Sequence, residues 1–564
     1  MHAWHGNMLV VDLSAGRTRS EPIEEETLRT WLGGRGLGVH LMKDFVSLEP
    51  FDERMPLFFS VGPLCGTAAP TSSRMSVVSR SPLTGTIFDS SVGGTFPLKL
   101  KQAGYDAIMI TGKAQDPVYL EIDEYRAVLK DASWLWGKGC IEVNKLLADA
   151  GEVASIGPAG ERRVRMANIM IGGANSVGRG GMGALMGAKN LKAIVVDGSK
   201  RPTVADQALF QKAYDDVMRL LRASPVVMGE LGLAEFGTSA LVDIVDQRRM
   251  APTENFRKTW YPQAHLYSGP ALKKAFGFKK EGCAICPIQC KKITNCGRPI
   301  PEYETLSHFG ALNANPDAES IIRANILCNN MGLDTISTAA TIAAYGEARG
   351  EFLISDDILD MVRQIAYREG DGDQLAEGSK RYCESIGKPG LSMSVKGLEM
   401  PAYDPRGSYG MALAYGTSNR GACHLRAYPI SQEILRKPVA TDRFSFDGKA
   451  RLIKISEDTN AVVDSLSVCK FAFLGASIEE YAQLLAGATG TAYTGQGLQK
   501  TGEEIIALER HYNRLNGFGE KDDLLPERFF TDEGSSGEGI EVPALDRARF
   551  TEEMERYYRI RKQM

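Results

Sequence analysis

Short apolar segments separated by turn-forming residues dominate the first 200 residues of the chain. Apolar runs of this length, bounded by Gly, Pro and Ser, are typical of β-strands. Seven segments show the pattern: MLVVDLS (8–14), PLFFSVGPL (56–64), RMSVVSR (74–80), AIMITG (107–112), VYLEID (118–123), VASIGP (153–158) and KAIVVDG (192–198). The N-terminal part is therefore predicted to be rich in β-structure.

Glycine is dense in the same region, at GGRGLG (33–38), at Gly93 and Gly94, and at GRGGMG (178–183). We expect these glycines at the ends of strands, where a backbone without side chains can approach a ligand closely. GGRGLG does not have the spacing of the dinucleotide-binding fingerprint, and no acidic residue follows a clear strand at the expected distance. A dinucleotide-binding domain is therefore not expected.

After about residue 203 the apolar positions recur at helical spacing. The clearest examples are 205–224, 335–350 and 356–370, each of which has apolar residues on one face of a helix. Strands and helices are segregated along the chain instead of alternating. This order predicts an α+β fold in which a glycine-rich β domain is followed by one or two mainly α-helical domains.

Composition limits the class of protein. A chain of 564 residues exceeds the roughly 250–300 residues at which one core stops growing, so two to four domains are expected. The formal net charge of -4 gives no electrostatic reason to expect a nucleic-acid or membrane partner. Apolar runs long enough to span a bilayer and the sections of a signal peptide are both missing from the sequence. We therefore predict a cytoplasmic protein.

The segment GCAICPIQC (282–290) gives the strongest chemical signal. Cys283, Cys286 and Cys290 follow a C-x2-C-x3-C spacing, and three thiols this close are rarely needed for packing. An iron–sulfur cluster takes three ligands from one such loop and a fourth from elsewhere in the chain. Structural zinc is the alternative, with Cys296 as a local fourth ligand.

Four lysines flank the cysteine segment: Lys279, Lys280, Lys291 and Lys292. They have two interpretations of about equal weight. The lysines form a solvated loop surface, or their charge favours the reduced cluster and attracts an acidic electron-transfer partner.

Two further segments, NNMGLD (329–334) and DSLSVC (464–469), share one pattern: a polar residue, two other residues, a small residue, an aliphatic residue, and Asp or Cys. With the cysteine segment, they make the sequence resemble the tungsten-containing aldehyde:ferredoxin oxidoreductase family, whose pterin-binding signature D-x-x-G-L-(D/C) occurs twice. The resemblance covers nearly the whole chain. Segments similar to the family also occur, in the family's order, at 72–94, 178–196, 301–305 (PEYET) and 420–426 (RGACHLR).

The resemblance implies a fold, cofactors and binding residues. The fold is a β-rich domain (1–202) that forms a base for the cofactor, covered by two mainly helical domains (203–398 and 399–564). The cofactors are a tungsten bis-pterin with magnesium and a [4Fe–4S] cluster, whose fourth ligand is Cys469 beside Cys283, Cys286 and Cys290. The positions that match or adjoin cofactor contacts of the family are Arg74, Ser91, Gly93, Arg179, Gly180, Asn329, Gly332, Leu333, Asp334, Asp464 and Arg426. Arginine forks and bare backbone suit phosphate, and side-chain oxygens suit the N–H edge of a pterin.

The resemblance also implies an activity. Glu304 in PEYET and His424 in RGACHLR match the residues that face the family's metal, and Tyr303 helps to shape the site. The implied reaction oxidises an aldehyde to a carboxylic acid: His424 donates a hydrogen bond to the carbonyl oxygen and Glu304 accepts a proton. Electrons then leave through the cluster to ferredoxin or to a multi-cluster iron–sulfur subunit, with a flavin subunit in some relatives.

The chain departs from the family signature at three positions, because Asn329 replaces Asp, Ser467 replaces Gly and Val468 replaces Leu. We expect these mild changes to leave pterin binding intact. Two alternatives stay open: a tungsten subunit like that of benzoyl-CoA reductase, with Cys328 as a candidate metal ligand, and an electron-transfer subunit with the cluster alone. Homo-oligomers and hetero-oligomers both stay open as well.

Overall fold

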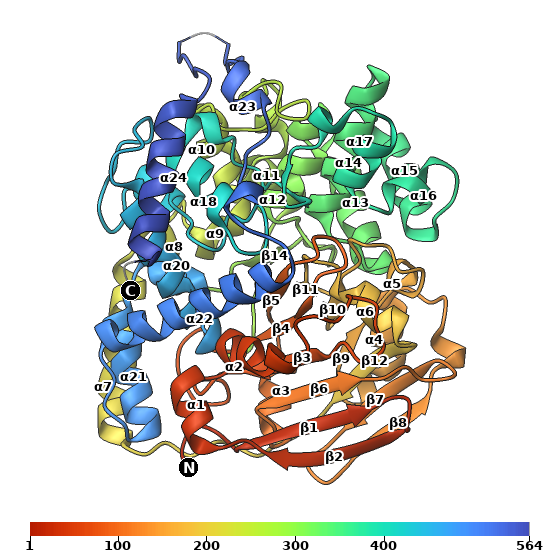
Figure 1. Ribbon diagram of the computed structural model, residues 1–564, viewed down its shortest axis with the longest axis vertical. Coiled ribbons are helices and arrows are strands. Elements are labelled where there is room, and N and C mark those ends of the chain that lie inside the picture. Colours follow the sequence, from red (N-terminus) through yellow and green to blue (C-terminus); the bar gives the residue numbers. More distant parts are fainter. Residues whose placement is uncertain (538, 563–564) are drawn as a thin grey trace.

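The computed structural model describes residues 1–537 and 539–562. The strands β1–β12 all lie before residue 197, and beyond that point the described chain is mainly helical apart from short two-stranded hairpins. Figure 1 shows this division, with the red and orange sheets at one end of the molecule, the green helices at the other, and the blue helices α21 and α22 beside the sheets. The predicted α+β order is confirmed, whereas the domain boundaries at 202 and 398 stay predictions.

The N-terminal part contains two six-stranded mixed sheets. The first has the order β2 (Arg17–Pro22), β1 (Asn7–Asp12), β6 (Ala107–Thr111), β3 (Leu57–Val61), β4 (Arg74–Arg80) and β5 (Ile87–Gly93). The second has the order β11 (Asn175–Val177), β10 (Ile169–Ile171), β9 (Glu152–Ser155), β12 (Leu191–Val196), β7 (Val118–Ile122) and β8 (Ala127–Asp131). Most neighbours are antiparallel, but β1 runs parallel to β6 and β12 runs parallel to β7.

Each of the seven predicted strands exists, and the sequence pattern missed mainly the polar strands at the sheet edges. The strand β2, RTRSEP, has mainly exposed side chains, with only Thr18 and Glu21 half-buried, and it has no apolar run. It nevertheless pairs with β1 along its whole length. A charged edge strand of this kind protects a sheet from pairing with other chains.

The two sheets pack face to face between two layers of helices. Leu9, Phe59 and Ile108 of the first sheet share one buried core with Leu120 and Ile194 of the second. The outer face of the second sheet packs against α4 (Cys140–Leu147). The outer face of the first sheet is covered by helices from both ends of the chain: α2 (Gly34–Leu41), α7 (Gln207–Ala223), α20 (Lys449–Ser465), α21 (Ile478–Thr489) and α22 (Gly495–Leu515).

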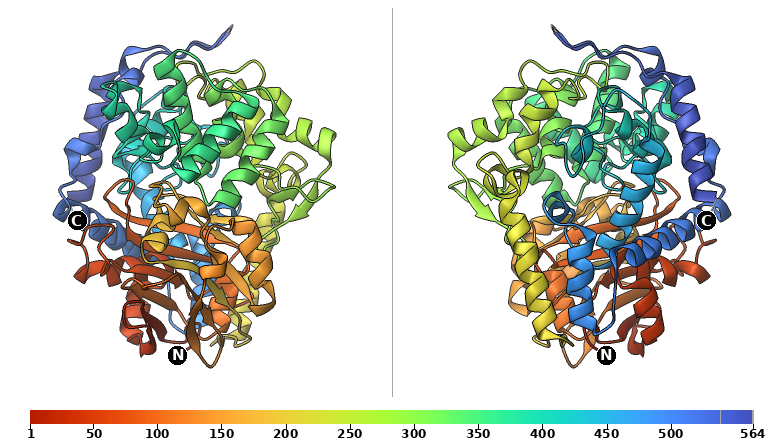
Figure 2. Two further views of the ribbon diagram at one scale, coloured as in Figure 1. Left: turned by 90° about the vertical axis from the view of Figure 1, so that its right-hand side faces the viewer. Right: turned by 90° about the vertical axis from the view of Figure 1, so that its left-hand side faces the viewer.

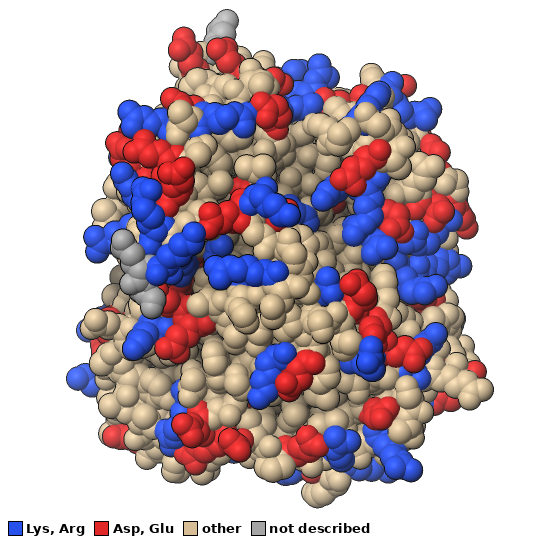
Figure 3. Space-filling view, in the orientation of Figure 1, with Lys and Arg blue, Asp and Glu red and all other residues tan. Residues whose placement is uncertain are grey.

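The helices that cover the first sheet bring the C-terminal third of the chain back to its beginning. The helices α7 and α21 run side by side next to the N-terminal segment, as the right-hand view of Figure 2 shows. The predicted helices at 335–350 and 356–370 are α14 (Thr335–Arg349) and α15 (Ser355–Tyr367), which belong to a separate helical core beyond the sheets. On the face shown in Figure 3, basic and acidic side chains are interspersed. No helix within the described residues combines the length and the apolar character that crossing a membrane requires.

The expectation that GGRGLG (33–38) ends a strand beside a ligand is wrong, because this segment begins the helix α2. Its glycines instead allow α2 to lie directly against the backbone of another segment. A Cβ atom on Gly34 would lie 2.2 Å from the carbonyl oxygen of Asp464, and one on Gly62 would lie 2.4 Å from the carbonyl carbon of Leu466. Two segments of the N-terminal part therefore fit directly onto the end of α20.

Substitution of Gly62 by alanine should destabilise the protein by about 1–3 kcal/mol, because the added methyl group must displace backbone atoms. Gly390→Ala is the control, since an added Cβ there meets no atom within 4 Å and the residue is not in the left-handed region. Urea unfolding of both variants measures the difference. Equal midpoints for the two variants would show that the contact between Gly62 and Leu466 is not tight.

Candidate active site

A cavity of about 380 Å³ lies between the β5 end of the first sheet and the helical part of the chain. Most of the residues predicted to bind cofactor line it: Arg74, Ser91, Gly93, Arg179, Asn329, Leu333, Asp334, Arg426 and Asp464. Glu304, His424 and Cys469 line the same cavity. Segments more than 300 positions apart in the sequence therefore converge on one hollow.

Two predicted binding residues do not line the cavity. Gly180 has a φ of +87°, and a Cβ atom there would lie 2.5 Å from the ring of Phe88. Gly332 has a φ of +75°, and a Cβ atom there would lie 2.8 Å from the amide nitrogen of Gly157. Both glycines serve chain conformation and close packing in this structure.

The two similar motifs form the same structure at the ends of two helices. In the first, α13 (Ala318–Met331) ends at Gly332 and the amide of Leu333 donates to the carbonyl of Cys328 at 2.9 Å. In the second, α20 is followed by Ser467, which has a φ of +63°, and the amide of Val468 donates to the carbonyl of Val463 at 3.1 Å. This is the Schellman arrangement, in which a residue in the left-handed region terminates the helix.

Serine in the left-handed region is uncommon, and a specific contact supports Ser467 there. Its hydroxyl oxygen accepts a hydrogen bond of 2.6 Å from the backbone amide of Gly62. The departure from glycine at this position therefore adds a bond to the N-terminal part. After the two helix ends, Asp334 caps α14 and Cys469 precedes the short 3₁₀ helix η9 (Lys470–Leu474).

The cysteine segment is the loop of a hairpin between β13 (Lys279–Glu281) and β14 (Lys291–Ile293). Cys283, Cys286, Cys290 and Cys469 are free thiols of intermediate burial. Burial raises the pKa of Cys286 to about 11, and the neighbouring Cys469 and Cys283 thiols act in the same direction. The four sulfur atoms are therefore close enough to interact electrostatically, although Cys469 is far from the others in sequence.

Gly93 and Arg74 are opposite each other on β5 and β4, at the inner side of the hairpin loop. A Cβ atom on Gly93 would lie 2.4 Å from the sulfur atom of Cys283, so only glycine leaves room for that thiol. Arg74 donates to the hydroxyl oxygen of Ser91 at 3.1 and 3.2 Å and lies among the thiols. Its positive charge suits a group that carries thiolates.

Cys296, the local ligand in the zinc alternative, lies apart from this group. It is exposed, and its sulfur atom contacts the hydroxyl of Thr294 at 3.2 Å. In residues 1–537 and 539–562, no three or more His, Cys, Asp and Glu side chains are gathered as ligands of one metal ion. An iron–sulfur cluster distributes its four ligands over several iron atoms, so its thiols do not need to converge on a point.

The flanking lysines divide into two pairs. The Lys292 ammonium donates to the carbonyl of Gln289 at 2.6 Å, and Lys291 donates to that of Ala174 at 2.5 Å, so both hold the loop in place. Lys279 and Lys280 are exposed, and Lys280 lies 3.4 Å from Glu235. The hairpin therefore carries one pair of lysines that holds the loop and one pair that lies at the surface.

A buried ionic network surrounds one end of the cavity, and sequence analysis missed most of it. Asp89 contacts Arg426, and its Oδ1 lies 3.4 Å from Nε of Arg35. Arg35 is also bonded at 2.7 and 2.8 Å to Glu509, and Asp464 forms an ion pair with Lys470. Burial disfavours the charged carboxylate, yet Arg426, Arg35 and Arg420 hold the pKa of Asp89 far below its ordinary value. Asp89 lies inside the family-like segment 72–94, which was the available signal.

A second cavity, of about 660 Å³, adjoins the first and shares Glu302, Glu304, His424, Leu425, Lys470 and Phe471 with it. Its other walls include the side chains of Tyr303, Tyr403, Tyr428 and Phe473. Glu304 and His424 therefore stand at the junction of a polar chamber and this second cavity, which we call the aromatic channel after Tyr303, Tyr403, Tyr428 and Phe473, although aliphatic and polar side chains also line it. Convergent polar groups in such a place are typical of a binding or catalytic site.

Glu304 and His424 face each other at this junction. Oε1 of Glu304 lies 3.6 Å from Nε2 of His424, and Oε2 accepts a hydrogen bond of 2.9 Å from the amide of Ala402. Burial raises the pKa of Glu304 to about 8, and burial together with Arg179 holds the pKa of His424 well below its ordinary value. Among the described residues, Oε1 of Glu304 and Nδ1 of His424 have no hydrogen-bond partner, so both are available to a ligand.

Comparisons with known proteins agree with this geometry. The family model "Aldehyde ferredoxin oxidoreductase, N-terminal domain" matches residues 8–198, and "Aldehyde ferredoxin oxidoreductase, domains 2 & 3" matches residues 212–562. The chain is 39% identical to the tungsten-containing aldehyde ferredoxin oxidoreductase of Pyrococcus furiosus, over 100% of this chain and 96% of that protein. It is 38% identical to the enzyme of the same name from Thermococcus kodakarensis, with the same coverage.

A solved structure extends the comparison to the fold. The active-site complex BamBC of benzoyl coenzyme A reductase, bound to 1,5-dienoyl-CoA, superposes with a TM-score of 0.84 at 22% identity. The superposition covers 99% of this chain and 94% of that one. At this identity the likeness concerns the fold alone.

Replacement of Asp89 by asparagine should destabilise the protein by about 3 kcal/mol or more, because buried arginines lose their counter-charge. The control Asp123→Asn breaks an exposed ion pair with Arg126 and should cost less than about 1 kcal/mol. Because the pKa of Asp89 is lowered in the folded state, its contribution is present above pH about 4 and is lost as pH falls further. Denaturant unfolding between pH 3 and pH 7 should therefore show a flatter acid dependence for Asp89→Asn; parallel curves would contradict the network.

Proposed function

Since the chain belongs to the tungsten-containing aldehyde ferredoxin oxidoreductase family, we propose that it oxidises aldehydes to carboxylic acids and passes the electrons out through an iron–sulfur cluster. The observation that carries the proposal is the meeting of Glu304 and His424 where the aromatic channel opens into the polar cavity. The reaction converts an aldehyde and water into a carboxylic acid, two protons and two electrons. The acid, the protons and the electrons each need a route out of the site.

The polar cavity fits a pterin cofactor that carries phosphates. Within the described residues, six buried polar atoms of cavity-lining residues have no hydrogen-bond partner: Oε1 of Glu304, Nδ1 of His424, Oδ1 of Asn168, Oγ of Ser176, Nε of Arg420 and Nε of Arg426. Donors and acceptors left unsatisfied in a buried cavity indicate that a polar ligand completes them. Arg74, Arg179 and Arg426 would hold phosphate groups with their magnesium, and the side chains of Asn329, Asp334 and Asp464 would accept from pterin N–H groups. When bound, the tungsten pterin supplies the two-electron oxidation.

The four thiols Cys283, Cys286, Cys290 and Cys469 would hold the [4Fe–4S] cluster. Cys469 also lines the polar cavity, so one residue belongs to both sites. Arg74, which lies among the thiols, lines the cavity as well. This contiguity gives electrons a short route from the cavity to the hairpin loop, where Ile285 is 49% exposed beside the exposed Lys279 and Lys280. Ferredoxin or an iron–sulfur subunit would accept them there.

Glu304 and His424 would divide the proton chemistry between them. His424 is neutral because of its lowered pKa, so it donates one N–H to the carbonyl oxygen of the aldehyde and stabilises the negative charge that develops there. Glu304 accepts a proton as an oxygen nucleophile derived from water is added. Both groups line the same two cavities, and each side chain is mostly buried, with 14% of Glu304 and 12% of His424 exposed.

The aromatic channel would select an uncharged aldehyde. Tyr303, Tyr403, Tyr428 and Phe473 contribute large apolar surfaces to its walls. The charged residues that line it are Lys437, Lys470, Glu302, Glu304 and Glu480, and Lys470 is bound to Asp464 in an ion pair. The alternative, a reaction like that of benzoyl-CoA reductase, is supported by the fold likeness alone. Its candidate ligand Cys328 is fully buried in the helical core and does not line either cavity.

Glu304→Gln and His424→Asn should each lower kcat for aldehyde oxidation by about 10²–10⁴-fold, because the first loses the proton acceptor and the second weakens the oxyanion contact. Both variants should keep the tungsten and iron content of the wild type, since neither side chain is proposed to hold the cofactors. Activity with a viologen acceptor and elemental analysis measure the two effects. Near-full activity in either variant would refute the role assigned to that residue.

Cys469→Ser should contain markedly less iron and acid-labile sulfide than the wild type, because the cluster loses its one distant ligand. Cys296→Ser removes an exposed thiol of the neighbouring loop and should leave both contents unchanged. The two variants are purified anaerobically and compared with the wild type. The reverse result, in which Cys296→Ser alone loses metal, would favour the local zinc alternative.

A further inference from the structure

His308 lies one helical turn after Glu304 in α12 (Tyr303–Phe309) and is fully buried. Its Nδ1 lies 2.6 Å from the carbonyl oxygen of Glu304, and its Nε2 lies 3.1 Å from the carbonyl oxygen of Met400. Carbonyl oxygens can only accept hydrogen bonds, and a neutral imidazole can donate only one. The geometry therefore provides an acceptor for a proton on each ring nitrogen.

We propose that His308 is a positioning residue for the proposed aldehyde oxidation: it carries both ring protons, and its positive charge keeps the carboxylate of Glu304 ionised and in place. This proposal rests on the proposed function of Glu304 as the proton acceptor. A protonated carboxyl group at that position has no capacity to accept a second proton. His308 itself keeps its two protons throughout the reaction.

The carboxylate is close enough to the ring for this effect. Oε2 of Glu304 lies 3.6 Å from Nδ1 of His308 and accepts from the amide of Ala402 at the same time. The opposite oxygen, Oε1, points toward His424. Oε2 of Glu304 is thus held by the Ala402 amide and the His308 ring, while Oε1 remains open toward the site.

Burial acts against each charge when the groups are taken separately, since it raises the pKa of Glu304 and lowers that of His308. For His308 this effect of burial is larger than the stabilisation of the protonated ring by the two carbonyl oxygens, so the charged state depends on the Glu304 carboxylate, 3.6 Å away, with which the ring forms a pair of no net charge. The charge of Arg179 lowers the pKa of both Glu304 and His308, and the charge of Asp334 raises both. The two side chains form an ion pair of 3.2 Å with each other. The other titratable groups near the pair in the described part of the chain are Tyr303, Tyr403, Tyr415, Tyr428, His424 and Cys423. The local geometry therefore favours the charged pair over a neutral one.

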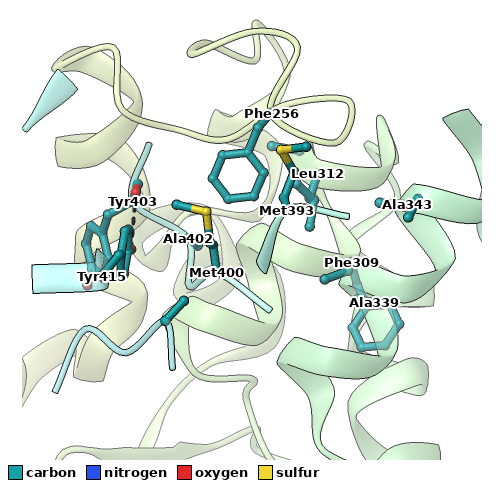
Figure 4. Packing of buried hydrophobic residues seen from close by; sticks show 14 of the residues in the cluster. Phe256, Phe309, Leu312, Ala339, Ala343, Met393, Met400, Ala402, Tyr403 and Tyr415 are labelled. Atoms are coloured by element: carbon teal, nitrogen blue, oxygen red, sulfur yellow. Dashed lines mark hydrogen bonds between the residues drawn. The ribbon is translucent and has the colours of Figure 1, made fainter. Parts of the chain in front are cut away.

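The acceptor on the far side of the ring belongs to a firmly held segment. Tyr303 donates to the carbonyl of Ala402, and Tyr415 donates at 3.2 Å to the carbonyls of Pro401 and Tyr403. Figure 4 shows Met400 and Ala402 as members of the buried cluster that also contains Phe256 and Met393. The carbonyl of Met400 is therefore unable to turn away from an unprotonated nitrogen, and a neutral ring would face a repulsive contact there.

Histidine nitrogen NMR of the oxidised holoenzyme, labelled with ¹⁵N-histidine, tests the protonation state directly. We expect one ring with both nitrogens protonated at pH 7 and slow to exchange. His308 is the one fully buried histidine of the seven, all of which lie in the described residues. Loss of this signal in His308→Gln assigns it. If that variant does not fold, the slow exchange assigns the signal. A single protonated nitrogen on the buried ring at pH 7 would overturn the proposal.

The pH profile of turnover tests the consequence for Glu304. In His308→Gln, which removes the charge, the acid limb of the kcat profile should move up to about pH 8, so that kcat at pH 7 falls about tenfold and recovers at higher pH. KM, tungsten and iron should stay close to the wild-type values. His265→Gln, at an exposed histidine that also contacts a carbonyl, should leave the profile unchanged.

The two tests separate the proposal from the function on which it rests. A His308→Gln profile that superimposes on that of the wild type would overturn the positioning role, even if the enzyme is active. If the wild-type holoenzyme oxidises no aldehyde, the proposed function fails instead. The NMR result still shows whether His308 and Glu304 form a charged pair.

Discussion

The end of helix α20 is the point on which the rest of this structure depends. Within six residues, the segment 464–469 terminates a helix, places Asp464 in the buried ionic network and delivers Cys469 to the cysteine hairpin. It can do so because Gly34 and Gly62 bring backbone of the N-terminal part against it, and because the Gly62 amide bonds to Ser467. This contact between the N-terminal part and the end of α20 therefore determines both the shape of the polar cavity and the position of Cys469, the fourth thiol.

Buried charge gives the cavity its chemical character. Arg35, Asp89, Arg426 and Asp464 compensate one another in a network that is almost inaccessible to water, yet Nε of Arg426 keeps no partner among the described residues. Removal of one member of such a network strongly destabilises the fold, because it leaves a buried charge unpaired. The network also holds the remaining donors in fixed directions. The same principle operates on a smaller scale at Glu304, where a histidine behind the carboxylate and a backbone amide beside it fix the group that faces the channel.

Much of the fold followed from the sequence, because apolar runs and helical spacing reflect burial directly. The strand at 57–61 and the helix at 207–223 are examples. The strand β2 was missed because an edge strand needs no apolar run, and GGRGLG was misassigned because glycine permits close packing as readily as ligand contact. At the site, the motifs identified Glu304, His424 and the residues of the polar cavity. Arg35, Asp89 and His308 were missed because their importance lies in partners that are distant in sequence or in two backbone carbonyls, which leave no pattern of their own.

Both the proposed aldehyde oxidation and the proposed iron–sulfur cluster depend on which metals the protein holds. The most direct measurement is elemental analysis of anaerobically purified protein, from cells grown with tungstate, for tungsten, molybdenum, iron and zinc. We expect about one tungsten and about four irons per chain. Iron without tungsten would contradict the proposed oxidation and leave only an electron-transfer role, and zinc alone would contradict the assignment of both cofactors.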